Sequence, residues 1–552
     1  DRTGYTDTFI PNAIGSYSYS NVANFVANTP YQSIVETPAT GFTLASDVSH
    51  YYLLDISPLI QDTWKPNSKL TVIGGLRMDY PYLPQKPIFS PVFFNAYGFS
   101  NSISMNGNYT IAPRVGFNYN FETKLPTQLR GGAGLFLGQN PVVWVENSYN
   151  NAGQLNSITN GVVSAAVPSF DYTAKDFHWP ANWKENIAID KTLPFLGLIA
   201  TAEIDLTQVQ KDVFYQETNP YAVPTSGSLT MPDGRLRFAG NITPSAIGAA
   251  YYLPGYTTSN FYTSVTNSPT VLYQNHATGA VYELTNTDKG GTQEYTVELN
   301  RPMTDHWAFE LAYTYTHATQ VDPFTSSVAG SGFTGQPIIN PNDNIPYHSN
   351  YSVPNKWVAQ ATREFNFFKR RNTTTSITAQ FVTENGSAYS FVFKGDADGS
   401  GITGESLFYV PSGPNDPKVQ WLSATEEANF FSYLATNPQL AKWAGQIAPR
   451  NSVYAPWQEV LNLHFEQQVP IWKDVHVTLY ADCFDFSNLI DKHSGLVDDF
   501  NNAFYTQTVA GTGYNKATGR YQYVFNNGTL GTPSIYSDLS RWQVQVGARL
   551  EF

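Results

Sequence analysis

The chain has 552 residues and a formal net charge of −13, and it combines only 14% charged residues with 15% aromatic residues. Soluble domains carry about a quarter charged residues, and a chain this rich in aromatics is not disordered. The mean hydropathy is −0.30, and the longest apolar stretches, such as 194–202, are far shorter than the ~18 to 20 residues of a membrane-spanning helix. A helical membrane protein is therefore excluded, which leaves outer-membrane β-barrels and secreted all-β proteins.

The composition also limits the chemistry and the partners. The single cysteine, Cys483, cannot form a disulfide within the chain. The acidic balance gives no electrostatic reason to expect nucleic acid as a partner. The sequence contains no nucleophile elbow, phosphate loop, dinucleotide fingerprint or His-Glu-x-x-His motif, so we expect no enzymatic activity.

Apolar and polar residues alternate strictly in many segments. Between Leu70 and Tyr80 the even positions are almost all apolar, whereas the odd positions include Thr71, Arg77 and Asp79. Such a period of two over about ten residues predicts strands with one apolar face. The pattern recurs at 109–121, 129–137, 295–299, 307–315, 461–465 and 475–481.

The connections between these segments alternate between short and long. Short turns fall at 65–69, 122–127, 192–196, 301–306, 368–372 and 470–473, and long connections lie near 81–108, 139–182, 219–277, 320–350, 394–452 and 491–537. In outer-membrane barrels the short turns are periplasmic and the long loops are extracellular, whereas a soluble sandwich has no reason to sort loops in this way. The sequence therefore predicts an all-β fold, a transmembrane antiparallel β-barrel.

About fourteen strands are expected, of which the segment 279–301 is one long strand with a break near Gly290-Gly291. The other expected strands, in chain order, are 31–44, 48–64, 69–80, 108–121, 127–138, 182–192, 196–218, 306–320, 351–367, 372–393, 453–469, 474–489 and 538–552.

The last strand carries the most specific local signal. Its even positions are all apolar and end on a carboxy-terminal aromatic residue: Trp542, Val544, Val546, Ala548, Leu550 and Phe552. This pattern resembles the signal that the outer-membrane barrel-assembly machinery reads. The alternative is an ordinary edge strand that ends on Phe552 by chance.

Hairpin motifs carry a resemblance to a known family. Residues 58–66 read PLIQDTWKP, and they are followed by Leu70-Thr71 and Gly75-Leu76-Arg77. Residues 111–117 read IAPRVGF, and residues 129–136 read LRGGAGLF. In this combination and order they resemble barrel hairpins of TonB-dependent outer-membrane receptors. Further segments are similar to the Oar-like branch, whose members carry a carboxypeptidase-regulatory-like extension: 187–194, 282–290, 450–451 and 455–457.

The resemblance implies a 22-stranded barrel with an N-terminal plug and a TonB box. In residues 1–552 we find neither a plug-like segment before the first strand nor a TonB box. We therefore expect that the chain is the C-terminal part of one outer-membrane β-barrel domain, and that the plug domain and the early strands are not in this sequence.

One segment has the pattern of a metal site. Residues 395–406 read GDADGSGITGES, with oxygen-bearing side chains at Asp396, Asp398, Ser400 and Glu405. Alternate oxygen ligands and a glycine for the turn are typical of calcium loops. Ser400 and Ser406 stand where Asp would be expected, which removes two anionic ligands, and a plain turn is the alternative.

Charged residues in the strands are expected to face the lumen. The lumen arginines are Arg77, Arg114, Arg130 and Arg549, and the acidic pairs Asp62/Asp79 and Glu298/Glu310 are more simply solvated lumen charges than general acid and base.

Three functions remain open for a protein expected in the bacterial outer membrane, in contact with outer-membrane lipid. The first is TonB-dependent import of a scarce polar substrate, such as an oligosaccharide, a peptide or a siderophore, with the TonB system reached through the missing N-terminal part. The second is a structural or adhesive barrel that holds surface-exposed protein partners. The third is a passive porin. The substrate-binding residues cannot be read from the sequence, because in this fold they lie in loop geometry.

Overall fold

The structure is a computed structural model. It describes residues 2–8, 12, 14–39, 42–43, 48–151, 155–163, 169–218, 230–237, 280–368, 373–400, 402, 404–472, 475–499, 506–515, 518–525 and 534–552.

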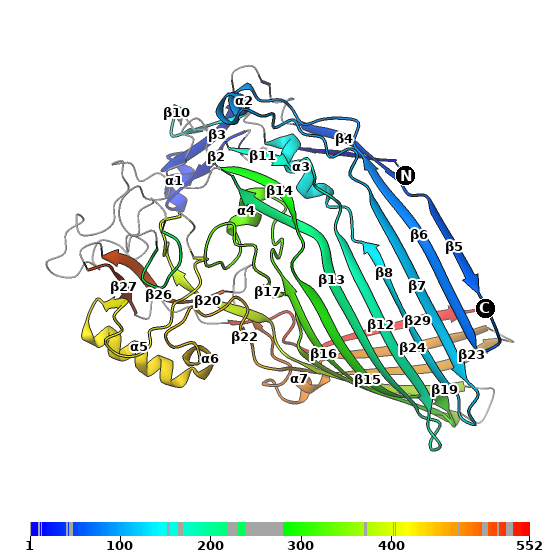
Figure 1. Cartoon of the computed structure of the whole chain (residues 1–552). Helices are drawn as coiled ribbons and strands as arrows, with labels where there is room; N and C mark the ends of the chain where they lie inside the picture. Colours follow the sequence, from blue (N-terminus) through cyan, green and yellow to red (C-terminus); the bar gives the residue numbers. More distant parts are fainter. Residues whose placement is uncertain are drawn as a thin grey trace.

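A large antiparallel wall of long strands dominates the molecule (Figure 1). Most strands of the wall pair with the wall strands that precede and follow them along the chain, as a meander of hairpins requires. The long strands are β4 (Val48–Ile56), β5 (Leu59–Trp64), β6 (Leu70–Tyr82), β7 (Thr110–Phe121), β8 (Thr127–Leu137), β12 (Ala181–Thr192), β13 (Ile199–Glu217), β15 (Gly291–Thr304), β16 (Trp307–Gln320), β18 (Asn355–Phe368), β19 (Thr373–Glu384), β23 (Gln458–Trp472), β24 (Val475–Phe484) and β29 (Gln543–Glu551). The same 18-stranded sheet also includes β1 (Arg2–Thr8), β11 (Phe170–Thr173), β14 (Val281–Thr287) and β17 (Tyr347–His348).

The register gives the wall one apolar and one polar face. Ile377 lies opposite Phe465, whereas Thr378 lies opposite His464, and directly opposite residues share a face. Ile377 and Phe465 are each more than 40% exposed, as side chains on a lipid-facing surface would be. The polar face is therefore the lumen side. This confirms the all-β barrel prediction.

Short turns and long loops lie at opposite ends of the wall (Figure 1). The turn between β5 and β6 covers residues 65–69, and the turn between β7 and β8 covers 122–126. Residues 369–372 of the expected turn at 368–372 lie outside the described residues. The expected break at Gly290-Gly291 separates β14 from β15, because both glycines have positive φ values, +106° and +153°.

The first expected strand, 31–44, is not part of the wall. Its regular part, β3 (Gln32–Pro38), pairs with β2 (Ser16–Ser18) and β9 (Leu155–Thr159) in a separate small sheet, which β10 (Val162–Val163) completes. Seven residues are also fewer than the about 9 to 11 that a membrane-spanning strand needs. Instead, β1 pairs with β4 from Arg2 opposite Leu54 to Thr8 opposite Val48.

The expected strand 372–393 is also two elements. β19 ends at Glu384, and β20 (Ala388–Lys394) turns away into a five-stranded sheet with β21 (Val419–Trp421), β22 (Val453–Tyr454), β26 (Thr506–Asn515) and β27 (Arg520–Val524). Gly386 lies at this corner, where an added Cβ would be 2.4 Å from the carbonyl oxygen of Pro456. Only glycine allows the two backbones to approach so closely.

The long loops fold into a layer with its own core. We use the term outer layer for the five-stranded sheet together with α5 (Ala424–Thr436) and α6 (Pro438–Ala441). Both helices lie beside that sheet in Figure 1. Its core contains fully buried aromatic side chains, among them Phe391, Phe393, Phe408, Phe430, Tyr521 and Tyr523. Ser423 caps α5 by accepting a hydrogen bond from the backbone N–H of Glu426. Loops of this length are thus ordered by burial of apolar area.

The remaining helices are short and lie in the connections. They are α1 (Val22–Val26), α2 (Pro91–Tyr97), α3 (Val142–Asn150), α4 (Ala329–Thr334) and α7 (Phe486–Ile490), and β25 (Asp498–Asp499) pairs with β28 (Ser534–Ile535). None of the helices in the described part of the chain is long and apolar enough to cross a membrane.

Candidate functional site

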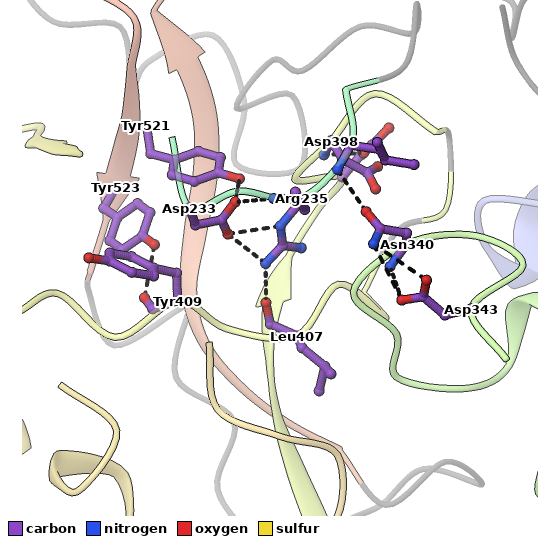
Figure 2. A network of polar contacts seen from close by, with 11 residues as sticks. Asp233, Arg235, Asn340, Asp343, Asp398, Leu407, Tyr409, Tyr521 and Tyr523 are labelled. Carbon is purple, nitrogen blue, oxygen red and sulfur yellow. Dashed lines mark hydrogen bonds and ion pairs between the residues drawn. The ribbon is translucent and has the colours of Figure 1, made fainter. Parts of the chain in front are cut away.

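A buried ion pair lies at the centre of the outer layer (Figure 2). Arg235 donates from Nε to Oδ2 of Asp233 at 2.8 Å, and both side chains are fully buried. Tyr521 donates its hydroxyl hydrogen to Asp233 at 3.0 Å, and Arg235 also donates to the backbone oxygen of Leu407. Burial opposes the charge of Arg235, but Tyr521, Asp233 and Asp398 outweigh it and raise its pKa.

This pair fixes the described part of the loop between β13 and β14, residues 230–237, into the outer layer. Asn340 accepts a hydrogen bond from the backbone N–H of Leu236 at 2.7 Å and is itself held by Asp343 (Figure 2). Sequence analysis missed these residues. The available signal was Pro232-Asp233-Gly234, which is typical of a turn, but nothing in the sequence indicates that the following arginine is buried.

The predicted calcium loop is buried beside this pair. Asp396 Oδ1 accepts hydrogen bonds from the backbone N–H groups of Asp398 at 3.0 Å and Gly399 at 2.8 Å. Asp398 Oδ1 accepts from the N–H of Ser400 at 3.0 Å, and the hydroxyl of Ser400 accepts from the N–H of Ile402 at 3.3 Å. The acidic residues therefore stabilise the turns of their own loop.

Glu405 differs from the other members of the loop. It is 7% exposed, its Oε2 has no hydrogen-bond partner among the described residues, and burial raises its pKa to about 8. Within the described ranges, no group of three or more His, Cys, Asp or Glu side chains could hold a metal ion. Calcium binding by Asp396, Asp398, Ser400 and Glu405 thus stays a prediction.

Arg450 and Asn451, which contribute to the family resemblance, connect several loops. Arg450 is 1% exposed and donates to the backbone oxygens of Gln320 and Val321 and to the side chain of Gln336. Burial lowers the pKa of Arg450 to about 10. Asn451 donates to the backbone oxygen of His348 at 2.7 Å. Both residues therefore hold the loops over the strand ends.

The expected lumen charges lie on the polar face, with one exception. Arg77 is paired with Asp79 at 2.6 Å, and Arg549 lies 3.7 Å from Glu551. Asp62 lies opposite Gly74, on the same face as Val72 and Leu76, so the expectation that it faces the lumen is wrong. The strand register, and not the local sequence around Asp62, determines its face.

The strand expected to be the barrel-assembly signal, β29, pairs with β24. The apolar side chains of the segment 542–552 are exposed, from 46% for Trp542 and 74% for Val546 to 100% for Phe552. They form one apolar surface on the lipid side. Recognition of these residues by the assembly machinery stays a prediction.

The wall, its apolar outer face and the loops gathered at one end define a transmembrane β-barrel. Residues 3–491 match the family described as outer membrane beta barrel domain, and the chain belongs to that family. It is therefore a protein of the bacterial outer membrane.

Other comparisons give only distant likenesses. No curated protein matches the sequence. Among solved structures, a mutant of the ferric enterobactin receptor PfeA from Pseudomonas aeruginosa is similar at 10% identity and a TM-score of 0.40, over 94% of this chain and 50% of that one. BauA, the ferric preacinetobactin receptor from Acinetobacter baumannii, is similar at 9% identity and a TM-score of 0.23, over 94% and 69% of the two chains. The chain spans about half the length of the PfeA chains.

Proposed function

We propose that this protein is a TonB-dependent receptor of the Oar-like branch that imports a scarce polar substrate of the oligosaccharide, peptide or siderophore class. The observation that carries the proposal is the folded outer layer over one end of the barrel. A passive pore needs an open mouth, whereas a receptor needs ordered loops that hold a ligand. The buried pair of Asp233 and Arg235 and the contacts of Arg450 make these loops rigid.

We also propose that the same receptor has a plug domain and further barrel strands, which lie outside these 552 residues. β5 supports this part, because all six of its residues are exposed, and an exposed strand invites pairing with another strand. The mass of the protein recovered from native membranes tests this part.

Import can be tested with cells that do or do not produce the protein. Labelled oligosaccharides, peptides and iron chelates are offered with and without a protonophore. TonB-dependent import predicts accumulation of at least one compound that the protonophore abolishes. Entry that is insensitive to the protonophore would instead indicate a passive porin.

A cleft favours the scaffolding alternative as second candidate. It has a volume of about 1050 Å³ and lies between α5 and α6 on one side and the start of β23 on the other, where Tyr433, Gln439 and Trp457 line it. A surface protein that co-purifies in stoichiometric amount, together with no import of any compound, would favour this function over uptake.

A further inference from the structure

Arg114 has unusual neighbours on the lumen face of the wall. It lies opposite Gly75 on β6 and opposite Gly134 on β8. A Cβ added to Gly75 would be 3.2 Å from Nε of Arg114, and a Cβ added to Gly134 would be 2.8 Å from its Cβ. Because they have no side chains, the two glycines leave room for the arginine side chain and leave open space beside it.

A cavity of about 490 Å³ lies beside Arg114. Arg77 and Asp79 of β6 line its wall, and Asn140 and Trp179 line it from the loops that join β8 to β12. Binding cavities for small molecules have volumes of about 300 to 1,000 Å³. The cavity thus has the size and the position of a site for part of a small ligand, between the loops and the lumen.

Two hydrogen-bond donors at this cavity have no acceptor among the described residues. Within the described residues Arg114 makes no hydrogen bond or ion pair, and its Nε is buried. Trp179 is 3% exposed, and its Nε1 also has no acceptor there. A buried donor without a partner costs about 1 to 3 kcal/mol, and native proteins rarely leave such groups unsatisfied. Both donors therefore lack an acceptor within the described residues, and a ligand in the cavity would supply one.

The other charges that line the cavity already have partners. Arg77 donates to Asp79 at 2.7 Å, and Ser57 donates to the same carboxylate at 2.7 Å. Asp55 accepts a hydrogen bond from Asn140 at 2.9 Å. Among the described residues that line the cavity, Arg114 is thus the positive charge without a counter-charge, while Asp55 and Asp79 make the surroundings unfavourable for a ligand with two negative charges.

We propose that this cavity binds a carboxylate group of the imported substrate, with Arg114 as its counter-ion and Trp179 as the second donor. The inference rests on the proposed uptake function and narrows its substrate to a molecule that carries a monoanionic carboxylate. The planar guanidinium of Arg114 matches two carboxylate oxygens, which a neutral amide cannot replace.

The test is a calorimetric titration of the purified protein in detergent with benzoate, benzamide and phenyl phosphate. Benzoate binds, and benzamide binds roughly tenfold or more weakly, since it lacks the charge. Arg114→Gln weakens benzoate binding by at least about tenfold, and Trp179→Phe weakens it by several-fold because the ring stays and the N–H is lost. Arg549→Gln is the matched control, since it removes a lumen arginine outside the cavity, and it leaves binding unchanged.

Heat-modifiable gel mobility shows whether each variant has folded, and Trp179→Phe keeps the test decisive if Arg114→Gln does not fold. Equal binding of benzoate and benzamide, tighter binding of phenyl phosphate, or no benzoate binding would each overturn the proposal. Binding in detergent needs no energy source, so a failure of benzoate to bind would not contradict the proposed import, which the uptake experiment tests separately. Failure of import with intact benzoate binding would overturn the uptake function and leave a carboxylate site.

Discussion

Arg130 and Glu203 form a bidentate ion pair across three strands of the wall, with Nη1–Oε1 at 3.2 Å and Nη2–Oε2 at 2.8 Å. Ala188 of β12 lies between them and pairs in register with both. Its small side chain lets the arginine on β8 reach the glutamate on β13, and the residue is 2% exposed. Arg130 also contacts Asp190 at 3.1 Å. One arginine therefore bridges two carboxylates on neighbouring strands.

We expect Arg130→Gln to destabilise the barrel by about 1 to 3 kcal/mol, because it leaves two carboxylates without their cation. Glu203→Gln should cost less, since Asp190 still pairs with Arg130. Denaturant titration of the folded fraction in detergent measures both variants, and the double variant completes a double-mutant cycle. If the two effects simply add, the pair does not contribute as an interaction.

The buried pair of Asp233 and Arg235 in the outer layer should contribute more to stability than the pair of Arg130 and Glu203. Arg235→Met leaves Asp233 as a buried carboxylate without its ion-pair partner, and breaking a buried pair typically costs about 3 to 5 kcal/mol. We expect proteolysis of the outer layer to accelerate while the barrel stays folded on gels. Arg541→Gln is the control, because its pair with Asp538 is exposed. Equal protease resistance of Arg235→Met and the unchanged protein would contradict the structural role of the pair.

Glu405 predicts a pH dependence of the outer layer. Burial raises the folded-state pKa of Glu405 to about 8, above the usual 4.5 of this side chain. The folded state therefore holds the proton more tightly than the unfolded state, so stability falls as the pH rises from about 5 to about 8, by at most about 1.4 kcal/mol per unit. Glu405→Gln should remove this part of the slope. Protease resistance of the outer layer at several pH values measures it, and an unchanged slope in the variant would refute the assignment.

The calcium prediction has its own test. If Asp396, Asp398, Ser400 and Glu405 bind the ion, added calcium should protect the 394–412 segment from protease, with a stabilisation of about 2.7 kcal/mol at a hundredfold excess over Kd. Chelator should reverse the protection, and Asp398→Asn should weaken it. Magnesium serves as the matched ion control. Indifference to chelator in the unchanged protein would argue for the plain turn.

The carboxy-terminal residue should affect assembly. We expect Phe552→Ala to lower the amount of protein inserted in the outer membrane several-fold, because the exposed apolar edge of β29 loses its terminal aromatic. Glu551→Gln, on the other face of the strand, is the control. Membrane fractionation and heat-modifiable mobility give the measurement. Normal insertion of Phe552→Ala would leave β29 as an ordinary edge strand.

Much of the wall could be predicted because alternation is a local property of the chain. The apolar and polar faces of the segment from Leu70 to Tyr80 can be read from its own residues, whatever strands lie beside it. Gly290-Gly291 indicates a break, because glycine alone adopts such backbone angles at little cost. The face of Asp62 could not be predicted, because pairing with Gly74 determines it. The prediction of a barrel strand at 31–44 was wrong for a similar reason, since the partners of this segment are β2 and β9 and not a barrel strand.

The sequence by itself determined the barrel class, most of the strand spans and the ends at which turns and loops gather, because a period of two and the length of each connection are local properties of the chain. Only the tertiary structure decided that the loops form a packed layer and that Arg235 is buried against Asp233. It also decided that Arg114 lies between two glycines and that its Nε has no acceptor in the described part of the chain. These relationships join residues far apart in the chain, and whether a charge is matched or left unpaired depends on which strands and loops the fold brings beside it.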